Sequence, residues 1–156
     1  MKFTLIKDLK QDSLIKPILS GLLIFTLLYL VADVIVKHVT LGIFLTDIKY
    51  SLFGNEEEFL DPMLQATFLE FWHIEIFFIM MILLSLSAVY IRLSTMNIKN
   101  LVILNTTLLC AILSLIAIVL SYFVSESFVI VYVASFFVWH ILSFYMALIS
   151  LWNLHK

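Results

Sequence analysis

Four long apolar stretches limit what this chain can fold into. They cover about residues 18–45, 63–93, 101–123 and 128–151. A helix of about 20 apolar residues is long enough to cross a bilayer. Hydrophobic residues make up 63% of the chain and charged residues 13%, against about half and a quarter in soluble domains. The sequence therefore predicts an all-α integral membrane protein that folds in the lipid bilayer as an antiparallel bundle of four transmembrane helices.

The connections between these stretches indicate one membrane domain over residues 1–156. Residues 1–17 alternate lysines with apolar residues and are expected to lie on the inner membrane surface. Residues 46–62 form a polar loop, and the four-residue connection 124–127 requires an antiparallel hairpin. The first apolar stretch is too long for the hydrophobic region of a cleaved signal peptide, so it is expected to remain as a span.

The distribution of Lys and Arg predicts the orientation in the membrane. Cytoplasmic segments carry an excess of these residues. One side of the predicted bundle holds seven of them, and the other side holds only Lys49 among several acids. The seven are Lys2, Lys7, Lys10, Lys16, Arg92, Lys99 and Lys156. We therefore expect both termini in the cytoplasm, the loop 46–62 outside, and the inner membrane of a bacterium as the location.

Several function classes find no support in the sequence. The net charge of −2 offers no basic surface for nucleic acid. The single cysteine, Cys110, excludes an internal disulfide and a CxxC redox motif. Neither a P-loop, a nucleophile elbow nor HExxH occurs, so hydrolysis is not expected, and the sequence leaves any other enzymatic activity undecided.

Ionisable residues inside the apolar stretches mark the expected site. A charge at the centre of a bilayer costs about 2.5–3.5 kcal/mol on insertion scales, so each needs a partner or a function. These residues are Asp33, Lys37, His38, Glu70, His73, Glu75 and His140.

Three of these residues are expected to form a buried charge network. Asp33 and Lys37 are four residues apart on the polar face of the first span, close enough to pair. Glu70 lies on the predicted inward stripe of the second span and is expected to join them. Glu75 points away from His73 and is expected to face another helix, the headgroups or another subunit.

A histidine-based cofactor site in the outer half of the bundle is the first functional hypothesis. Haem b between two helices needs two imidazoles at matching depth. His38 and His73 match in depth, and His73 with His140 is the second choice. Gly42, four residues after His38, is expected to leave room for a porphyrin. Such a protein would transfer electrons between membrane quinol and an outer acceptor.

A metal ion is the second hypothesis. Three imidazoles and a carboxylate suit Zn, Cu or Fe, and the candidate ligands are His38, Glu70, His73 and His140, with Asp33 as a further option. Glu70 and His73 form an ExxH step, of which di-iron bundles use two copies.

Two hypotheses of other classes remain open. The first is an oligomeric pore, transporter or membrane effector that uses the buried Asp, Lys, Glu and His side chains. The second is an accessory subunit of a larger membrane complex, in which these residues fix the packing. His155, at the inner boundary, is expected to be solvated.

Overall fold

Four long helices form the body of the computed structural model, which describes residues 14–95 and 97–156. Each is apolar and long enough to span a membrane, with mean hydropathies between 1.9 and 2.5. The predicted all-α bundle of four spans is confirmed. The expected interfacial segment falls largely on residues 1–13, outside the described residues. The long helices are α1 (Ile15–Thr40), α3 (Gln65–Leu93), α4 (Ile98–Phe123) and α5 (Phe128–His155).

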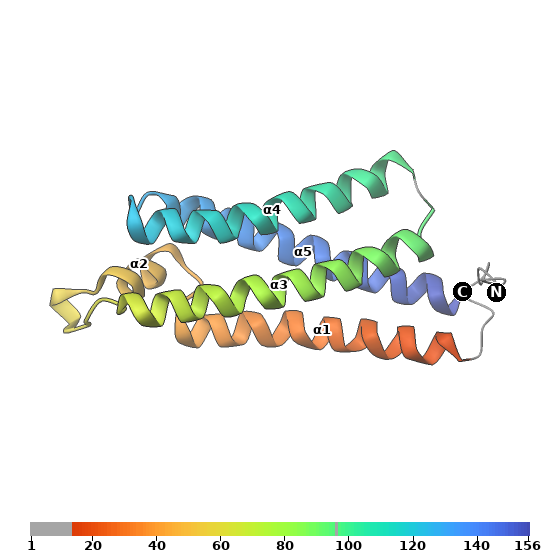
Figure 1. Cartoon of the computed structure of the whole chain (residues 1–156), viewed down its shortest axis with the longest axis horizontal. Coiled ribbons are helices and arrows are strands. Elements are labelled where there is room, and N and C mark those ends of the chain that lie inside the picture. Colours follow the sequence, from red (N-terminus) through yellow and green to blue (C-terminus); the bar gives the residue numbers. More distant parts are fainter. Residues whose placement is uncertain (1–13, 96) are drawn as a thin grey trace, which may run out of the picture.

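Successive long helices run in opposite directions along the bundle (Figure 1). At one end, Ser20 Oγ of α1 lies 3.1 Å from His155 Nε2 of α5; we call this the terminal end. At the other end, Lys49 pairs with Glu126 of the α4–α5 turn at 3.4 Å; we call this the loop end. The start of α1 and the end of α5 therefore share one end.

The loop end contains structure that the sequence analysis missed. The first span was expected to continue to residue 45, but α1 ends at Thr40 and a second helix, α2 (Leu45–Phe53), follows. A short 3₁₀ helix, η1 (Glu56–Glu58), comes next. The chain turns at Gly42, whose φ of +88° favours glycine, and a Cβ there would collide with Asp47. Gly42 therefore ends α1, which corrects the expectation that it opens space for a porphyrin beside His38.

Helix α5 is the centre of the bundle, since it contacts each of the other long helices and α2. The α4–α5 hairpin is packed closely because α4 presents small residues to α5. Thr107, Ser114, Ala117 and Ser121 are all buried in this face. A residue in the middle of α5 can therefore reach α1 and α3 at once, and His140 occupies such a position.

Candidate functional site

A lysine and an aspartate of α1 form the first part of the site. Asp33 and Lys37 are buried on the same face of the helix. Lys37 Nζ donates hydrogen bonds to Asp33 Oδ1 at 3.1 Å and Oδ2 at 2.9 Å. The predicted pair is therefore confirmed.

The third member is Glu75 of α3, not Glu70. Lys37 Nζ donates to Glu75 Oε2 at 2.7 Å, and 14% of the Glu75 side chain is exposed. Glu70 is exposed and forms none of the ion pairs found among the described residues. Its expected place in the network is taken by Glu75, because the face of α3 that packs inward is the one that carries Glu75.

His140 of α5 completes the site from the opposite side of Asp33. Its Nε2 lies 2.9 Å from Asp33 Oδ2, and its side chain is 7% exposed. Its Nδ1 lies 3.3 Å from the carbonyl oxygen of Phe136, one turn earlier. The imidazole packs against two aromatic rings, with centroid distances of 4.1 Å to Phe136 and 3.8 Å to Trp139.

The two contacts of His140 constrain where its protons are. A carbonyl oxygen can only accept, so a hydrogen bond to Phe136 forms in the tautomer that carries its proton on Nδ1. A neutral imidazole then has a lone pair on Nε2, which faces a carboxylate oxygen at 2.9 Å. The contact does not meet hydrogen-bond geometry, and Nε2 has no hydrogen-bond partner among the described residues. Two bare lone pairs would still repel at this distance. One proton between Nε2 and Oδ2 removes the repulsion.

The charges of the four side chains also indicate one bound proton. We call Asp33, Lys37, Glu75 and His140 the buried charge network. Two carboxylates and one ammonium leave a net charge of −1 when the imidazole is neutral. Charge without compensation is costly in a medium of low dielectric constant. One bound proton makes the network neutral. Lys37 Nζ also lies 4.9 Å from the centroid of the Phe136 ring, a cation–π contact.

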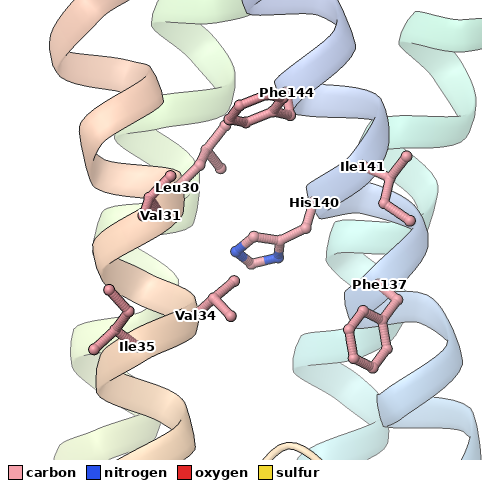
Figure 2. A pocket seen from close by; sticks show the side chains of 8 residues that line it. All are labelled: Leu30, Val31, Val34, Ile35, Phe137, His140, Ile141 and Phe144. Carbon is pink, nitrogen blue, oxygen red and sulfur yellow. The ribbon is translucent and has the colours of Figure 1, made fainter.

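Two hollows in the protein surface reach this network. The α1–α3 groove has a volume of about 350 Å³ and is lined by polar and apolar residues. Its polar lining residues are Lys37, Thr40, Thr67, Glu70 and Glu75. The α1–α5 pocket, of about 390 Å³, is lined by His140 and seven apolar residues. Figure 2 shows the imidazole pointing from α5 toward α1, beside Val34.

The remaining predicted ligands are not gathered around His140. His38 and His73 are both exposed, as is Glu70. No group of three or more His, Cys, Asp or Glu side chains in the described residues is arranged to hold a metal ion. Both ring nitrogens of His140 already face protein oxygens. Among the described residues, the predicted metal ligands are therefore not brought together, and His38 and His73 lie on exposed faces of their helices.

Comparison with known proteins assigns a family. Residues 42–156 match the family model of Aq_1264_TM, described as a transmembrane helical domain. The match includes Glu75 and His140 and begins after Asp33 and Lys37. Neither the curated proteins nor the solved structures gave a match. Because the family model covers well over half of the chain, this multi-pass membrane protein belongs to the Aq_1264_TM transmembrane helical domain family.

Proposed function

We propose that this protein binds and transfers protons inside the membrane, with the buried charge network as its proton-binding centre. The observation that carries the proposal is the 2.9 Å contact between His140 Nε2 and Asp33 Oδ2. The other nitrogen of the same imidazole faces a carbonyl oxygen. One bound proton removes the repulsion between Nε2 and Oδ2 and makes the buried charge network neutral.

The chemistry of the four side chains suits proton exchange better than a purely structural role. Buried ion pairs are often no more stabilising than apolar residues of similar volume, so packing alone gives little reason to keep one. All four groups can gain or lose a proton, and an arginine, which stays charged, is absent from the network.

A proton can move through the network in short steps. It passes between His140 Nε2 and Asp33 Oδ2 within their contact. Lys37 Nζ contacts Asp33 and Glu75 at 2.9 Å and 2.7 Å. It can donate one proton to Glu75 and take up the proton held by Asp33, so that it is an ammonium both before and after the transfer. The proton therefore has two alternative resting places, on the α5 side and on the α3 side of Lys37. In this proposal the loop end faces the outside of the cell, as the Lys and Arg distribution predicts.

Proton flux into liposomes tests the proposal. The purified protein is reconstituted with a pH-sensitive dye inside, and a potassium gradient with valinomycin drives protons inward. We expect the wild type to acidify the interior faster than empty liposomes. His140→Gln and Asp33→Asn, which remove the proton between the two side chains, should return the rate to that of empty liposomes.

His155→Ala is the matched control, because this exposed histidine lies at the terminal end, away from the network. We expect it to retain the wild-type rate. If His140→Gln conducts as well as the wild type, or if wild-type protein is no faster than empty liposomes, the proposal is wrong.

A further inference from the structure

The helices that hold the network end at different heights at the loop end. Lys37 is three residues from the last residue of α1, while its partner Glu75 is ten residues from the first residue of α3. At about 1.5 Å per residue, α3 therefore extends about 10 Å further than α1. This difference is visible in Figure 1, where α1 stops before α3 does.

The α1–α3 groove lies along this uncovered part of α3. Thr40, Thr67 and Glu70 line it and are exposed, and Lys37 and Glu75 also contribute to its wall. Such groups are expensive against lipid tails and are normally found beside water or protein. The groove volume of about 350 Å³ would hold on the order of ten waters at about 30 Å³ each.

The other approaches to the network are apolar. The α1–α5 pocket has no polar lining residue except His140. Toward the terminal end, the interior is filled by a packed cluster that includes Leu23, Leu86, Leu104 and Met146. Of the approaches to the network in the described residues, the groove at the loop end is therefore the one with several polar lining residues, although apolar atoms form most of its wall.

We propose that the α1–α3 groove is a water-filled entrance from the loop end, and that Glu70 is the residue that receives a proton there and passes it to Glu75. Glu70 and Glu75 are five residues apart on α3, a rise of about 7.5 Å, and both line the groove, so that water in the groove would connect them. The charged residues that line the groove with Glu70 are Lys37 of α1 and Glu75 of α3, and His73 is one turn further along α3. The role of Glu70 rests on the proposed function, whereas the presence of water does not.

Thiol accessibility tests the water in the groove without any proton transfer. In a Cys110→Ser background, single cysteines replace Ile74, which lines the groove, and Leu69, which does not. The two residues are similarly exposed, at 44% and 40%, and Ile74 is the further from the loop end. A charged methanethiosulfonate reagent, which reacts with thiolates in water, is applied to membrane fragments open on both sides.

We expect Ile74→Cys to react at least tenfold faster than Leu69→Cys, although it lies deeper. Ser143→Cys, one turn beyond His140 toward the terminal end, should stay unreactive. If Leu69→Cys reacts as fast or faster, the groove is filled by lipid and the inference is wrong.

Proton flux tests the role of Glu70 separately. Glu70→Gln should slow acidification of the liposome interior at least fivefold, and Glu57→Gln, an exposed acid of η1, should leave it unchanged. An unchanged rate in Glu70→Gln would refute the role of Glu70 while the proposed function stands. A reactive Ile74→Cys in a protein that conducts no protons would refute the proposed function while the water-filled groove stands.

Discussion

Replacing Lys37 with methionine removes the cation that separates two buried carboxylates. Methionine keeps most of the side-chain volume, so the main change is electrostatic. With one proton bound, the network changes from neutral to a net charge of −1. Removing one partner of a buried ion pair costs about 3–5 kcal/mol. Since the side chain of Glu75 is 14% exposed, we expect the lower end, about 3 kcal/mol, or a factor of more than 100 in the unfolding equilibrium.

A second substitution identifies the carboxylate that Lys37 neutralises. Lys37→Met combined with Glu75→Gln restores a neutral network and should recover at least half of the lost free energy of unfolding. Lys37→Met combined with Glu70→Gln should recover nothing, because Glu70 is exposed and makes no ion pair with Lys37. The two double variants differ only in which acid of α3 is neutralised.

Reversible unfolding in mixed micelles, followed by helix content as SDS is increased, measures these free energies. The reasoning is refuted if Lys37→Met costs less than about 1 kcal/mol, a typical value for an exposed pair. It is also refuted if the two double variants recover equally, because Glu75 would then not be the specific partner.

Three further predictions concern the turn, the cofactor and the orientation. Gly42→Ala should lower the free energy of unfolding by about 1–3 kcal/mol in the same assay, because φ is +88° and a Cβ would meet Asp47; an unchanged stability would contradict the turn. Protein expressed with haem supplied should show no Soret band when purified, since both nitrogens of His140 face protein oxygens; a band lost in His73→Ala would instead support the haem hypothesis. A protease site added at the C-terminus should be cut only from the cytoplasmic side, and cutting from outside would reverse the proposed orientation.

The general fold could be predicted from the sequence because lipid leaves the backbone few alternatives. A long apolar stretch must satisfy its backbone hydrogen bonds internally, so it forms a helix. The first boundary was missed because hydropathy continues through Gly42 into α2. The turn there depends on one left-handed glycine and on contact with Asp47, which composition does not show.

The site was predicted in part, and the error lies in the choice of a helix face. On α1, the i,i+4 spacing identified Asp33 and Lys37 without reference to other helices. On α3, the predicted inward stripe includes Glu70 and leaves out Glu75; its members are Thr67, Glu70, Phe77, Met81, Ser85, Ala88 and Arg92. Bulky apolar residues follow a different stripe that includes Glu75, at spacings of three and four. Its buried members are Phe68, Ile79, Leu83, Leu86, Tyr90 and Leu93.

The contact between Asp33 and His140 could not be predicted in the same way. Both residues are on inward faces, but their meeting depends on the relative rotation and depth of α1 and α5. A single sequence contains no direct information on these two quantities.

Nitrogen NMR of His140 tests most directly whether a proton is bound between His140 and Asp33. The protein is labelled with ¹⁵N-histidine in micelles at neutral pH, and the His140 signals are assigned by their loss in His140→Gln. We expect Nδ1 to be protonated, Nε2 to carry or share a proton, and the Nε2 signal to shift in Asp33→Asn. An Nε2 signal of a free lone pair that does not change in Asp33→Asn would contradict the proton-binding centre.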